Sequence, residues 1–196
     1  MSTRTLMMVV VAVVVFWLVG AYNRLMRHKN AVAHAFELID TQLKCRYDLT
    51  LSTVEVFKKC VNPERSMLET AMTARHLARA ASDAVRSRPT HAQSVAALSV
   101  AEEVLVGALN RLFASSVAYP ELKANTALRE LEQELFMVGG KVTFTCQVYN
   151  AAVLDYNHAQ GQFPVLMIAK LFGFMPSIQL LTTDEPIELH TTHLQV

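Results

Sequence analysis

The chain has 196 residues and a formal net charge of +1, with 52% hydrophobic and only 18% charged residues. The hydrophobic excess excludes a disordered chain, and the near-zero net charge argues against a protein that binds nucleic acid by bulk charge. The length suits one domain, or one domain with an appendage.

The N-terminal part of the chain is its most apolar stretch. Residues 5–23 carry no charge, and their centre consists almost entirely of Val, Leu, Met and Phe. A helix of this length reaches about the 30 Å thickness of the hydrocarbon core of a bilayer. We therefore predict a short N-terminus at residues 1–4 and a transmembrane helix at residues 5–23. Its representative anchor residues are Leu6, Val10, Val14 and Trp17.

Two alternatives to an anchor are a buried core helix and a cleavable signal peptide, for which Val19 and Ala21 offer a small-residue cleavage pattern. Arg24, Arg27 and Lys29 follow the apolar run directly and favour an uncleaved anchor. The same charges favour an external N-terminus and a cytoplasmic C-terminal part.

The cysteines agree with a cytoplasmic location. Cys45, Cys60 and Cys146 form an odd number without a CxxC pair, which is typical of free thiols in a reducing compartment.

Beyond the anchor, apolar residues recur at steps of three and four, as in the seam of a helical bundle or coiled coil. We predict long helices at about residues 24–61, 63–87, 91–118 and 125–160, within a bundle domain spanning residues 24–176. No breaker separates the first helix from the anchor, and short connections make consecutive helices antiparallel neighbours. The predicted fold class is all-α: an N-terminal transmembrane helix continuing into an antiparallel bundle of about four long helices.

Capping signals mark the predicted helix ends. Residues 62–64 (Asn-Pro-Glu) end one helix and start the next, Thr90 to Gln93 forms a capping-box pattern, and Asn125 can cap the fourth long helix.

The C-terminal region contains one more apolar segment, at residues 163–175. It includes Lys170 and is too short to span a bilayer, so it is either a core-packing segment or an interfacial helix at the membrane. Residues 177–196 lose the helical period and read as a flexible tail.

Motifs for chemistry are absent from the sequence. It contains no Gly-rich phosphate loop, HExxH, nucleophile elbow or CxxC. His190 and His193 have ligand-like spacing, but they lie in the predicted tail without further ligands. We predict that the chain is not an enzyme and has no catalytic residue, cofactor or metal site.

Several polar residues are candidates for structural contacts. Asp40 and Asp48 each lie four residues from Lys44, which is typical of a salt-bridged, solvated helix face. Arg46, however, lies on the apolar stripe. A second hypothesis therefore buries Arg46 against a carboxylate of the fourth long helix, such as Asp155, where the pair would set the register of the bundle.

Two tyrosine-asparagine pairs occur seven residues apart, Tyr149-Asn150 and Tyr156-Asn157. This spacing places both tyrosines on one helix face, where we expect each to pack and to make one hydrogen bond.

Three motifs resemble those of the LemA family: YNRLMRHKNAVAHAFELIDTQLKCRYDLT, NRLFASSVAYPELKAN and VYNAAVLDYNHAQGQFPVLMIAKLFGF. They appear in order and cover Tyr22 to about Phe174. The sequence departs from the family pattern at residues 50–53 (Thr-Leu-Ser-Thr) and at Gly139-Gly140, where two glycines suggest a kink or a close contact.

The resemblance implies a bacterial single-pass membrane protein whose bundle faces the cytoplasm and which has no settled biochemical activity. Some family members are associated with the magnetosome membrane, and others with membrane proteases. We therefore expect a scaffold or adaptor in the bacterial inner membrane, or in an internal membrane such as that of the magnetosome. Its expected partners are the lipid bilayer, other membrane or cytoplasmic proteins and a second copy of itself, but no nucleic acid. The alternative is an accessory subunit of a membrane enzyme or protease system.

Overall fold

The computed structural model describes residues 3–60 and 65–180, and within these ranges all regular structure is helical. The predicted all-α class is therefore confirmed. The helices are α1 (Thr3–Cys60), α2 (Arg65–Ser87), α3 (Ala92–Ser116), α4 (Pro120–Lys123), α5 (Thr126–Gly161) and α6 (Val165–Leu171).

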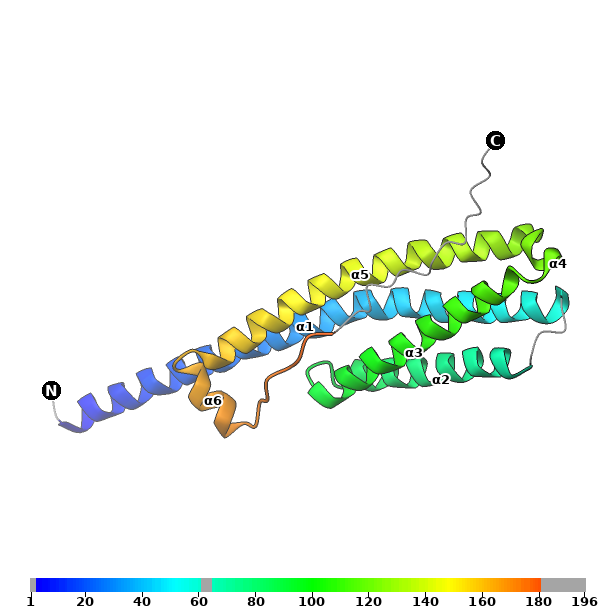
Figure 1. Cartoon of the computed structure of the whole chain (residues 1–196). Helices are drawn as coiled ribbons and strands as arrows, with labels where there is room; N and C mark the ends of the chain where they lie inside the picture. The colour runs from blue at the N-terminus through cyan, green and yellow to red at the C-terminus, as the bar shows by residue number, and fades with distance from the viewer. Residues whose placement is uncertain (1–2, 61–64, 181–196) are drawn as a thin grey trace.

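Helix α1 runs without interruption through the apolar N-terminal segment and into the bundle. Its 58 residues give a rod of about 87 Å. Helix α5 lies antiparallel beside it, the α2–α3 hairpin packs along its C-terminal half, and short α6 lies at the end of the bundle nearer the N-terminus (Figure 1). The two predicted segments, anchor and first bundle helix, are thus a single element.

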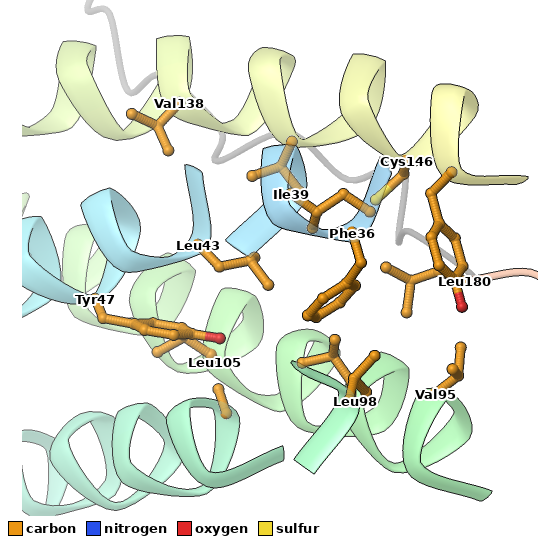
Figure 2. Close-up of a cluster of buried hydrophobic side chains, with 14 of the residues drawn as sticks. Phe36, Ile39, Leu43, Tyr47, Val95, Leu98, Leu105, Val138, Cys146 and Leu180 are labelled. Carbon is orange, nitrogen blue, oxygen red and sulfur yellow. The ribbon is translucent and has the colours of Figure 1, made fainter. Parts of the chain in front are cut away.

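The core is built from the apolar stripes of α1, α3 and α5. Figure 2 shows their side chains meeting between the helices, with Phe36, Leu98 and Val138 as examples from the three elements. Aromatic pairs join distant segments, with ring centroids 6.1 Å apart for Phe36 and Tyr149. The buried face of α2 is mostly small, with Ala71, Ala74 and Ala78 among its members. A face of alanines permits close helix approach but buries little apolar area.

Of the three predicted capping signals, two lie within the described residues, and one of these two is confirmed. Asn125 caps α5, accepting a hydrogen bond from the backbone N–H of Leu128 at 3.1 Å. The Thr90 capping box is wrong, because His91 is the N-cap residue of α3 and its Nδ1 accepts from the Ser94 N–H at 3.3 Å. The Asn-Pro-Glu signal at residues 62–64 lies outside the described residues.

The two adjacent glycines of α5 do not interrupt it, since the helix is continuous from Thr126 to Gly161. They differ in their surroundings. A Cβ at Gly139 would lie 3.9 Å from Nη2 of Arg46, whereas one at Gly140 would have no neighbour within 4 Å. Since 3.9 Å is an ordinary van der Waals distance, neither glycine marks the close contact that the sequence suggested.

The predicted flexible tail begins too early. Ser177 and Leu180 are buried against the bundle, with exposed fractions of 4% each. The rest of the predicted tail, including His190 and His193, lies outside the described residues.

Candidate functional site

The predicted anchor residues are all exposed. Leu6, Val10, Val14 and Trp17 have exposed fractions of 55%, 54%, 46% and 46%, and the apolar window has a mean hydropathy of 2.4 with only 6% of it buried. So large an apolar surface is unfavourable in water. Helix α3 is also long and apolar enough to cross a membrane, but it contributes Leu98, Leu105 and other side chains to the core.

Inside the bundle, Arg46 of α1 forms an ion pair with Glu102 of α3. Nη1 of Arg46 lies 2.7 Å from Oε2 of Glu102, and the two side chains are 7% and 13% exposed. The hydroxyl of Tyr47 donates to the other carboxylate oxygen of Glu102 at 2.5 Å. Burial, followed by the negative charge of Glu102, raises the pKa of Tyr47 far above its ordinary value.

The predicted burial of Arg46 is therefore correct, but the suggested partner Asp155 is wrong. Asp155 is exposed and lies sixteen residues beyond Gly139, the α5 residue beside Arg46. Sixteen helical residues amount to about 24 Å, which no arginine can reach. Glu102 lies on the largely buried apolar face of α3, as the apolar residues four positions before it and three after it indicate.

A third helix joins this cluster through Arg75 of α2. Its Nε donates to the backbone carbonyl of Tyr47 at 2.6 Å, and its Nη2 lies 3.8 Å from Oδ1 of exposed Asp48. The Arg46-Tyr47-Asp48 tripeptide thus contacts both helices of the α2–α3 hairpin.

Asp40, two helical turns before Asp48, forms a second link to the hairpin. Nε and Nη2 of Arg86 donate to its two carboxylate oxygens at 3.0 and 2.6 Å, and Ser82 donates to Oδ1 at 3.0 Å. Lys44 lies 2.9 Å from Oδ2, which confirms the predicted i,i+4 pair, but the Asp40 side chain is only 8% exposed, so the predicted solvated face is wrong at this residue. Burial by itself raises the pKa of Asp40, but the hydrogen bonds from Arg86, Lys44 and Ser82 outweigh it and hold that pKa below its usual range.

Asn150 and Asn157 of α5 hold the chain that follows α6. The side-chain amide of Asn157 donates to the carbonyl of Ser177 at 2.8 Å and accepts from its N–H at 2.9 Å. Asn150 makes the same pair of bonds with Leu180, at 3.1 and 2.8 Å.

The spacing of the two asparagines explains this match. Seven helical residues rise about 10.5 Å, and three residues of extended chain span about 10 Å. Two asparagine side chains seven residues apart on a helix can therefore each bond both the N–H and the carbonyl of one residue in an extended segment that runs antiparallel to the helix. We call each such pair of hydrogen bonds an asparagine bracket.

The tyrosines beside these asparagines point into the bundle. Tyr149 donates to the carbonyl of Pro89 at 2.8 Å and Tyr156 to that of Met175 at 3.3 Å, so each makes the predicted single bond. Burial raises the pKa of Tyr149 to about 12.

An open groove of about 460 Å³ lies between α1 and α5. It is lined by Gln42, Met137, Gly140, Lys141, Phe144 and Thr145. Met137 and Phe144 are 56% and 66% exposed, and Leu38, one turn before Gln42, is 52% exposed. Gly140 is an exposed lining residue without a side chain, and Gln42, Lys141 and Thr145 make half of the lining polar. Exposed apolar side chains of this kind can receive the apolar face of a helix.

No group of three or more metal-ligating side chains occurs within the described ranges. Cys146 is buried, and burial raises the pKa of its thiol to about 12, so it is inert as a nucleophile. Cys45 is exposed.

Comparison with known proteins identifies one family. The model of the LemA family matches residues 35–189, which is most of the chain. No curated protein matches the sequence.

The Arg46–Glu102 pair generates a first prediction. Arg46→Met should lower the free energy of unfolding by about 3 kcal/mol, because it leaves the buried Glu102 carboxylate without its cation. Arg46→Met combined with Glu102→Leu should recover most of that loss. The measurement is a double-mutant cycle by chemical denaturation of the full chain in detergent micelles. Strictly additive costs would contradict the coupling.

Asp40 generates a pH-dependent prediction. Because its folded-state pKa lies below its unfolded value, ionised Asp40 stabilises the fold above about pH 4, and this contribution is lost as pH falls through the folded pKa. Asp40→Asn should cost about 1–3 kcal/mol at neutral pH, and the difference from the parent should shrink under acid conditions. Thermal melting across pH measures both effects.

Glu37→Gln is the matched control for Asp40→Asn, because the Glu37 side chain is 68% exposed and pairs with His34, three residues earlier on the same helix. It should leave stability almost unchanged. A difference for Asp40→Asn that stays constant down to strong acid would contradict the assigned role of the charge.

The asparagine brackets generate a third prediction. Asn157→Ala should release Ser177 and lose about 1 kcal/mol for each of two hydrogen bonds. Hydrogen exchange should then accelerate at the Ser177 and Leu180 amides. Gln179→Ala, at an exposed position between them, is the control and should leave both rates unchanged.

Proposed function

The chain belongs to the LemA family, and from this premise we propose that it is a membrane-anchored scaffold or adaptor protein. In this proposal α1 spans the bilayer at residues 5–23, and the bundle presents a surface to partner proteins. The chain itself catalyses no reaction.

The observation that carries the proposal is the groove between α1 and α5. Its exposed apolar rim, Met137 and Phe144, flanks the bare backbone of Gly140. Exposed apolar clusters of this kind are typical of protein-binding surfaces. The occupant that fits best is an amphipathic helix of another membrane or cytoplasmic protein, because such a helix can cover Met137 and Phe144 with its apolar face.

Topology and setting are part of the proposal. Arg24, Arg27 and Lys29 follow the anchor, so we place the bundle in the cytoplasm and the N-terminus outside. The membrane is the bacterial inner membrane or an internal membrane such as that of the magnetosome, where the scaffold would take part in membrane formation. The alternative function is an accessory subunit of a membrane enzyme or protease system, which would use the same surface.

The proposal is tested by affinity isolation of the full chain from detergent-solubilised membranes. Phe144→Asp should abolish recovery of a reproducible partner, because a charge cannot enter an apolar interface unpaired. Leu77→Asp is the matched control, since Leu77 is a 57% exposed leucine on α2, away from the groove, and its variant should retain the partner. Equal recovery with both variants would contradict the groove as the binding surface. A partner that is a membrane protease whose turnover depends on the chain would establish the alternative.

The orientation is tested separately with Cys45, which is exposed on α1. In a Cys60→Ser chain, a membrane-impermeant maleimide should not label Cys45 in intact spheroplasts, and should label it after permeabilisation. Labelling from outside would reverse the topology.

A further inference from the structure

Helix α6 and its flanks carry an apolar surface that the bundle does not cover. One side of α6 packs on the core through Val165, Ile168 and Ala169. The opposite side exposes a set of large apolar side chains that we call the α6 apolar face. It comprises Phe163 (72% exposed), Leu166 (40%), Met167 (61%), Leu171 (79%), Phe172 (62%) and Met175 (76%).

The position of this face along α1 is set by aromatic contacts. Phe163 lies beside Trp17, with ring centroids 5.3 Å apart, and Phe172 lies beside Tyr22 at 5.5 Å. Trp17 belongs to the last turns of the apolar segment and Tyr22 to its end. The α6 apolar face therefore adjoins the end of the apolar N-terminal segment, and α6 itself lies beside this part of α1 (Figure 1).

The charges around α6 fit the same boundary. Between Ala159 and Pro176 the only ionisable side chain is Lys170, which is exposed. Arg24 donates to the side-chain carbonyl of Gln162 at 3.1 Å, and the Lys29 ammonium lies 5.4 Å from the centre of the Phe174 ring. Aromatic rings with flanking cations are typical of the headgroup region.

We propose that α6 is a second membrane contact, which lies in the headgroup boundary of the leaflet where the anchor ends. The occupant of the α6 apolar face is the lipid bilayer itself, because a surface continuous with a spanning helix meets lipid wherever that helix does. An amphipathic segment of this kind inserts its apolar side to the acyl boundary while its cation stays with the phosphates.

A second contact has a mechanical consequence. A single spanning helix can rotate about its own axis, whereas a helix fixed to a lateral segment in the interface cannot do so freely. Together, α6 and the anchor would hold the α1–α5 groove at a constant orientation to the membrane.

The proposal is tested with tryptophan fluorescence in phosphatidylcholine–phosphatidylglycerol vesicles whose acyl chains are brominated near the headgroups. Trp17 is the sole tryptophan of the chain, so a Trp17→Phe background accepts one new reporter. Leu171→Trp in that background should be quenched by brominated lipid. Val104→Trp is the matched control on an exposed site of α3 and should not be quenched.

Each alternative has a distinct outcome. Quenching of Trp17 in the parent chain shows that the anchor is inserted in the bilayer. If Trp17 is quenched but the tryptophan of Leu171→Trp is not, the α6 proposal is overturned while the anchor is supported. A Leu171→Trp signal that is protected from bromine and changes with the protein-to-lipid ratio would show a second copy on this face, and would also overturn it. Because no partner protein is present, failure here is distinguishable from failure of the scaffold proposal.

Discussion

The buried ion pair between Arg46 and Glu102 is the interaction on which the arrangement of the bundle depends. Helix α2 offers α1 mainly alanines, whose small apolar area supplies little packing energy and little shape to choose one register over another. A charge buried on α1 excludes most alternatives, because every register that separates it from Glu102 leaves a buried charge unpaired. The bonds of Arg75 to Tyr47 and of Arg86 to Asp40 extend this constraint to α2.

The same stretch of α1 also belongs to the element that carries the apolar N-terminal segment. Since α1 is one helix from this segment to the tip of the bundle, any displacement of residues 40–48 relative to the hairpin also displaces the apolar segment relative to the hairpin. The polar contacts hold the hairpin to α1, and aromatic contacts hold α6 beside the apolar N-terminal segment of α1. The two asparagines hold the chain after α6 to α5, while the α1–α5 groove remains open.

Helical periodicity accounts for both the successes and the errors of prediction from sequence. The period predicts an interior position for Arg46, and the same steps of three and four place Glu102 between Leu98 and Leu105 on the stripe of α3. The period could not predict that these two residues contact each other, since it gives the direction in which a side chain points but not the axial alignment of two helices. Asp155 has the carboxylate that the hypothesis requires, but it lies about 24 Å along α5 from Gly139, the residue beside Arg46. The predicted tail shows the same limit. Ser177 to Leu180 lack any periodic signal, and what orders them is two amides on a helix twenty to thirty residues earlier.

What the sequence by itself determined is the set of local properties: an apolar segment long enough to span a bilayer, the helical stripes, the Asn125 cap and the two tyrosine faces. Each of these properties depends on residues within a few helical turns of one another, where helix geometry alone determines the relative positions of the side chains. Only the tertiary structure decided the partners, namely Glu102 for Arg46, Arg86 for Asp40, backbone for the two asparagines, and Trp17 and Tyr22 for the segment around α6. Those contacts join residues from 20 to 150 positions apart, and their formation depends on how whole helices pack, which no local pattern encodes.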